Sequence, residues 1–146
     1  MDYTISKDTI LNTVKDITSR VAAQAYSEDG QSLYDGIVIT SGDAPQLDRF
    51  LEEGINSIIS RVADICTRTT TQSTDKLVFD VPDIPSEAAA ITPSLLNSYL
   101  AYFVSAKWFS VRSANDFEEY DKRATSALEA AVTQLKKRQI ISRRFS

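Results

Sequence analysis

The carboxylate pairs of this chain are the first groups to test for acid–base chemistry. Glu52–Glu53 and Glu118–Glu119 are adjacent pairs in segments of helical character. Neighbouring side chains on a helix point about 100 degrees apart, so the two members of each pair do not converge on one ligand. Asp80 and Asp83 lie on either side of a proline and carry oxygens that suit a hard cation, but they lack the spacing of a calcium-binding loop. Solvated helix faces and a turn are the favoured interpretation of these carboxylates.

Nucleophiles and metal ligands are scarce in the sequence. Histidine is absent, which removes the commonest metal ligand and general base and excludes Ser-His-Asp and Cys-His catalysis within the chain. Cys66 is the only cysteine, and its apolar neighbours at helical spacing predict a small core side chain on the second helix. The glycines are not followed by the Gly-Lys-Ser/Thr of a phosphate loop. We therefore expect no catalytic residue, no cofactor and no metal, and a protein that is not an enzyme.

The basic C-terminal end is the feature that most favours a function. Five of the 16 basic side chains follow residue 135, and the first 135 residues keep 11 basic against all 20 acidic side chains. Large apolar residues are interspersed with these charges: the set is Lys136, Lys137, Arg138, Ile140, Ile141, Arg143, Arg144 and Phe145. This mixture favours docking on an acidic protein surface. A solvated end and contact with nucleic-acid phosphates are the alternatives.

Four amphipathic stretches predict the helices that position these groups. The first follows Ser6 and carries an apolar stripe to Ala25; the second follows Asp43 and continues to Cys66, with Gly54 marking a close helix contact. The third begins at Thr92-Pro93 and is apolar around most of its circumference, which predicts a central position. Its aromatic residues indicate core packing, with a subunit interface as the alternative. The fourth runs from about residue 116 to 138.

Two segments rich in β-forming residues predict short extended stretches. The first contains Ile37, Val38 and Ile39, and the second contains Leu77, Val78 and Phe79. They either pair with each other across the second helix or lie at the edge of an assembly. The Thr/Ser-rich stretch 67–75 between the second helix and the second extended segment predicts a loop.

The fold class that follows is mainly α: a four-helix bundle-like domain over residues 1–138, with two short extended segments, which can form a small hairpin, and an extended tail over residues 139–146. One domain suits 146 residues. No apolar run reaches the length of a membrane span, so we expect no membrane contact. The first residues lack a signal pattern, and a lone cysteine suits a reducing compartment.

In the order of these segments and in their residue patterns, the chain resembles the head–tail connector, or adaptor, proteins of tailed bacteriophages. The resemblance covers most of the chain: a helix ending near Tyr26, the extended segment 36–40, the helix built on residues 45–51, a loop and strand over 67–81, the aromatic helix 92–113, a last helix and a charged tail.

The resemblance implies a structural virion protein that forms a homo-oligomeric ring, docks on the portal and links the capsid to the tail. It implies portal and tail or neck proteins as partners, room for transient contact with DNA passing the channel, and a place at the head–tail junction after assembly in the bacterial cytoplasm. The tail from Gln139 is then the segment that reaches a portal groove, and the segments near Ile37 and Leu77 serve neighbouring subunits. The alternative function is a small helical nucleic-acid-binding or other assembly module that uses the basic end.

Overall fold

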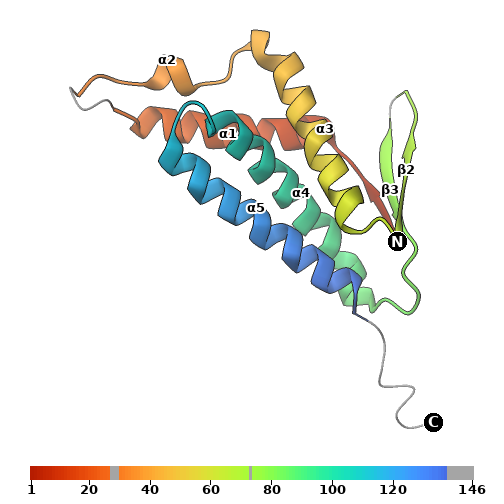
Figure 1. Cartoon of the computed structure of the whole chain (residues 1–146). Helices are drawn as coiled ribbons and strands as arrows, with labels where there is room; N and C mark the ends of the chain where they lie inside the picture. The colour runs from red at the N-terminus through yellow and green to blue at the C-terminus, as the bar shows by residue number, and fades with distance from the viewer. Residues whose placement is uncertain (27–29, 73, 138–146) are drawn as a thin grey trace.

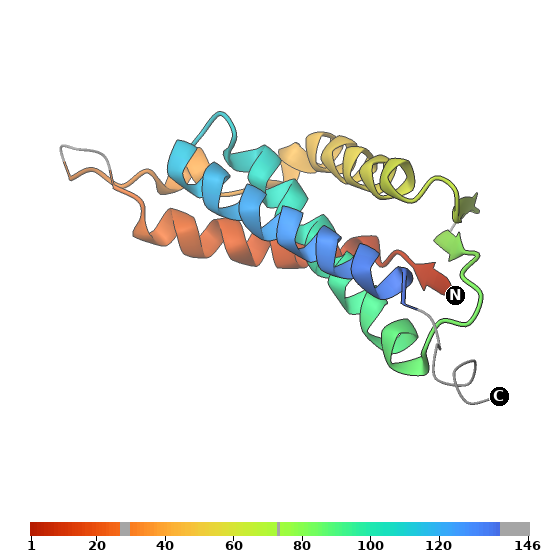
Figure 2. The same cartoon turned by 60° about the horizontal axis from the view of Figure 1, so that its bottom comes forward.

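Four long helices and a small antiparallel sheet make up the computed structural model of the chain, which describes residues 1–26, 30–72 and 74–137 (Figures 1 and 2). The elements in chain order are β1 (Asp2–Thr4), α1 (Lys7–Gln24), the short α2 (Tyr34–Ile37), a single 3-10 turn (Ser41–Asp43), α3 (Ala44–Arg61), β2 (Cys66–Thr70), β3 (Asp75–Phe79), α4 (Ser86–Phe109) and α5 (Ala114–Leu135). The mainly helical fold class predicted from the sequence is confirmed.

Helix α4 is the centre of the bundle, as its apolar circumference predicts. It packs against α1, α3 and α5, and both views show α5 running back alongside it. Leu96, Leu100 and Val104 on α4 are completely buried. The close helix contact predicted at Gly54 is confirmed, because a Cβ atom at this position would lie 3.0 Å from side-chain atoms of both Leu100 and Phe103.

The predicted start of the central helix at Thr92-Pro93 is wrong. Helix α4 begins at Ser86, and Pro93 lies inside it. The Ala88–Ala90 run has high helix propensity and carries the helix through the proline, which removes only one backbone donor. The Thr92 hydroxyl turns back to donate to the Ala88 carbonyl oxygen at 2.6 Å instead of capping a new helix.

The sheet has the order β1-β3-β2, and both pairs are antiparallel. The strand predicted around Leu77 is confirmed as β3, which pairs through Leu77 with both Tyr3 and Arg68. The stretch 67–75 is not a loop throughout, because residues 66–70 form β2. Cys66 therefore starts a strand and does not lie on the second helix, which ends at Arg61. Its neighbours are β-branched threonines, which favour extended backbone.

The strand predicted at Ile37–Thr40 is also wrong, and it does not pair with β3. Ile37 ends the short helix α2, where the Val38 amide donates to the Tyr34 carbonyl oxygen at 2.8 Å. The Ile37 carbonyl oxygen accepts a hydrogen bond from Trp108 Nε1 at 2.6 Å, with both groups buried. Because these backbone groups are already bonded, they are not available for a sheet ladder.

The C-terminal helix ends earlier than expected, at Leu135, so Lys136 and Lys137 follow it. The tail predicted over 139–146 lies outside the described residues, as does Arg138. Within the described ranges, no helix is both long and apolar enough to cross a membrane.

Candidate assembly surface

Strand β3 is the middle strand of the sheet, so both of its backbone edges are already paired. Leu77 and Phe79 are fully buried, and Val78 is half-buried on the opposite face. The sequence predicts that these three residues form an extended segment that serves a neighbouring subunit. Their place in the sheet leaves no edge of β3 open to a neighbouring strand, because the two edge strands of the sheet are β1, of three residues, and β2, of five.

The hydrogen-bond register shows which groups of β2 face away from β3. The Asp80 amide donates to the Ile65 oxygen and the Thr71 amide to the Thr74 oxygen, both at 2.7 Å. Bonded and non-bonded residue pairs alternate in an antiparallel ladder. The peptide groups of Cys66, Arg68 and Thr70 therefore point to the open edge. Along the described chain these groups have no backbone partner.

Arg68 ties this edge strand to the body of the protein. Its guanidinium donates to Asp75 Oδ1 of β3 at 3.0 Å and to Glu52 Oε2 of α3 at 2.9 Å, with a second bond to each carboxylate. The hydrogen bonds from Arg68 hold the pKa of Glu52 below its usual range, and the two carboxylates raise the pKa of Arg68. The carboxylates thus fix both the position and the charge of the arginine.

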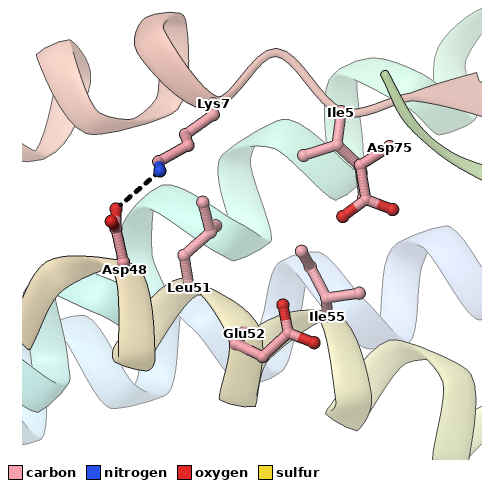
Figure 3. Close-up of a pocket in the computed structure, with 7 residues that line it drawn as sticks. All are labelled: Ile5, Lys7, Asp48, Leu51, Glu52, Ile55 and Asp75. Carbon is pink, nitrogen blue, oxygen red and sulfur yellow. Dashed lines mark ion pairs between the residues drawn. The ribbon is translucent and has the colours of Figure 1, made fainter. Parts of the chain in front are cut away.

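Figure 3 shows a pocket of about 210 Å³ beside this cluster, between α3 and the segment that joins β1 to α1. Ile5, Leu51 and Ile55 form its apolar lining. Lys7 and Asp48 form an ion pair of 2.9 Å at its rim. The charged groups that line the pocket are paired with each other or with Arg68, and the Arg68 pairs link the sheet to α3.

Two more of the carboxylates singled out in the sequence, one from each adjacent pair, are bonded to cations. Glu53 faces Lys107 at 3.8 Å, and Glu119 pairs with Arg123 one helical turn away at 2.6 Å. Burial raises the pKa of the Cys66 thiol, which disfavours the thiolate. Among the described residues, no group of three or more His, Cys, Asp or Glu side chains is placed to hold a metal ion.

The aromatic residues of α4 lie mostly in the core, which supports the core-packing interpretation over the interface one. Tyr99, Trp108 and Phe109 are buried, whereas Tyr102 and Phe103 are half-buried. Burial raises the pKa of Tyr99. The Arg112 guanidinium stacks over the Trp108 ring, 3.5 Å from its centroid.

The first proposed inter-subunit segment lies away from the sheet. Ile37 is buried, and Val38 and Ile39 are half-buried against the core. Figure 1 places α2 at the end of the molecule opposite the β2–β3 hairpin. The structure therefore does not bring the two predicted extended segments together.

The basic end is described only at its start. Lys136 and Lys137 are exposed immediately after α5. The remaining predicted contact residues lie outside the described residues: Arg138, Ile140, Ile141, Arg143, Arg144 and Phe145.

Strand β2 is the part of the surface that sequence reasoning missed. The alternation of Cys66 and Arg68, whose side chains face the body, with exposed Thr67 and Thr69 was the available signal. The Thr-rich composition of the segment instead predicts a loop.

Comparisons with family models, with curated proteins and with solved structures find no match to this chain.

Proposed function

We propose that the protein is a structural virion component, a ring-forming head–tail connector subunit that docks on the portal of a tailed bacteriophage. The order of the elements supports the proposal: a first helix, a long connection, a second helix, a strand hairpin, a central aromatic helix, a last helix and a basic end. One element departs from the resemblance, because the connection carries the short helix α2 where an extended segment was expected.

The basic end is the proposed portal contact, and one structural observation carries this part of the proposal. Helix α5 ends at Leu135, and the exposed Lys136 and Lys137 follow with no acidic side chain between them and the C-terminus. Charges of one sign favour association with an acidic surface, and apolar residues add contact area once docked.

The direct test is binding of the full chain and of a deletion from Gln139 to the cognate portal protein. We expect the deletion to abolish portal binding while the helical circular dichroism signal stays unchanged. Full portal binding by the deleted chain would refute the docking role of the tail. A matched control replaces Arg20 and Arg49, two exposed basic residues outside the tail, by serine and is expected to bind as the wild type does.

The alternative is a nucleic-acid-binding module, which the same pair of exposed lysines favours. Phosphate contacts make affinity fall steeply with salt. Binding to double-stranded DNA that weakens across a salt series, and that is lost when Arg143 and Arg144 are replaced by serine, would favour this alternative over the portal.

A further inference from the structure

The open edge of β2 has a self-complementary arrangement of backbone groups. Its outward peptide groups belong to Cys66, Arg68 and Thr70, so they are symmetric about Arg68. Figure 1 shows β2 on the outer side of the β2–β3 hairpin, with β3 between it and β1. An antiparallel copy of the same strand presents the same three groups in reverse order, which matches each donor with an acceptor.

The edge lacks most of the devices that proteins use to prevent strand addition. These devices are lysines, prolines, bulges or very short strands. Strand β2 contains no lysine and no proline, and its register with β3 is unbroken over the five residues. The side chains of Thr67, Thr69 and Thr70 are exposed and uncharged.

The one charged residue on the strand does not oppose a second copy. Inward-pointing charges can guard an edge because an arriving strand would bury them. Arg68 is already bonded to Glu52 and Asp75 of its own chain. Two such clusters would therefore meet with each guanidinium already compensated, so the two arginines do not repel each other as bare cations. Each cluster keeps one more negative than positive charge, and this repulsion weakens the contact without involving the backbone groups.

We propose that β2 pairs antiparallel with β2 of a second copy of this chain, about a two-fold axis at Arg68. The three outward residues of each strand then form six main-chain hydrogen bonds. On the exposed face Thr67 lies opposite the partner's Thr69, and threonine pairs across antiparallel strands are favourable. This contact is distinct from the proposed connector role, since it uses neither the tail nor a portal.

The residue sequence of β2 indicates that the strand added to its open edge is a second copy of β2. Cys-Thr-Arg-Thr-Thr places a threonine on each side of the central arginine, so the exposed faces of two copies match without a charge on either. A contact of five residues per strand is short, so we expect a weak dimer that forms at high protein concentration.

Disulfide trapping tests the register directly. Thr67→Cys and Thr69→Cys are made separately in the full chain carrying Cys66→Ala, so that each protein has one thiol. Residues opposite each other in a non-hydrogen-bonded pair lie about 4.5 Å apart at Cα, within the range of a disulfide. Residues that are diagonal across the pair lie about 7–8 Å apart, beyond that range.

We expect a disulfide-linked dimer on oxidation only when the two single-cysteine proteins are mixed. In the mixture, the dimer seen by mass spectrometry joins one Thr67→Cys chain to one Thr69→Cys chain. Strong cross-linking of either variant alone would overturn this register, and no cross-linking in the mixture would overturn the contact.

A proline at the open edge tests the hydrogen bonds to the partner without removing a hydrogen bond between β2 and β3. The Thr70 amide points away from β3, so Thr70→Pro removes a donor needed by the partner and none used within the chain. Thr70→Ala is the matched control, because both changes remove the same hydroxyl. We expect at least a tenfold lower yield of the mixed cross-link in the proline background than in the alanine background; equal yields would overturn the proposal.

Discussion

At the scale of single residues, Arg68 connects three elements. It lies on β2 and binds Asp75 on β3 and Glu52 on α3, with its side chain only 22% exposed. Its loss would leave two carboxylates facing each other without their cation. The sheet has few other charged links to the helices, so the position of the hairpin depends strongly on this side chain.

Replacing Arg68 by methionine is therefore expected to lower the free energy of unfolding by about 1–2 kcal/mol, between the values of exposed and buried ion pairs. Urea denaturation measures this change. The matched control is Arg61→Met, whose ion pair with Glu129 is more exposed and is expected to contribute about 0.5 kcal/mol or less. Equal losses in the two variants would show that Arg68 has no special role.

The same cluster predicts a dependence of stability on pH. The pKa of Glu52 is lower in the folded protein than in the unfolded chain because Arg68 binds its carboxylate. Its contribution is therefore fully present above the unfolded pKa of about 4.3 and is lost as the pH falls through the lower folded value. Urea midpoints measured from pH 6 downward should decrease less in Arg68→Met than in the wild type. Parallel curves would contradict the assignment.

At the scale of elements, the helices were the predictable part. Apolar residues at helical spacing located α1, α3, α4 and α5 because this pattern is contained within each segment. The ends of α3 and α4 were misplaced, since capping residues and a proline are weak signals where tertiary contacts decide. Strand β1 was not predicted, because its partner β3 lies more than 70 residues away and nothing local marks three paired residues.

The candidate surface was less predictable because it also depends on pairing between residues far apart in the sequence. Leu77 and Phe79 have strand-like residue types, but only the sheet order shows that β3 is internal and β2 is an edge strand. The Trp108–Ile37 hydrogen bond, which holds the connection before α3, joins residues 71 positions apart. The sheet order and this hydrogen bond both depend on how the helices pack, so residue types along the chain do not predict them.

The contact between α3 and α4 gives a prediction at this scale. Gly54→Ala adds a methyl group 3.0 Å from atoms of Leu100 and Phe103, and Leu100 is fully buried. We expect a loss of about 1–2 kcal/mol by thermal or urea unfolding, because overpacking exceeds the gain in helix propensity. Gly36→Ala is the control, since open space surrounds its added methyl; a loss as large as that of Gly54→Ala would contradict the packing argument.

At the scale of the whole molecule, the two ends of the bundle differ. The sheet and the end of α5 lie at one end, and α2 and the turn between α4 and α5 lie at the other, as both views show. The C-terminal end of α5, which the exposed Lys136 and Lys137 follow, lies at the end of the molecule that carries the sheet. In the proposed connector, this end faces the portal.

The state of assembly in the presence of portal protein tests this account most directly. Negative-stain microscopy of the full chain mixed with its cognate portal should show closed rings of this protein stacked coaxially on portal rings. Mass photometry of the same mixture should show a species heavier than the portal ring by several subunits. A protein that stays monomeric and separate from the portal at every tested ratio would contradict the account.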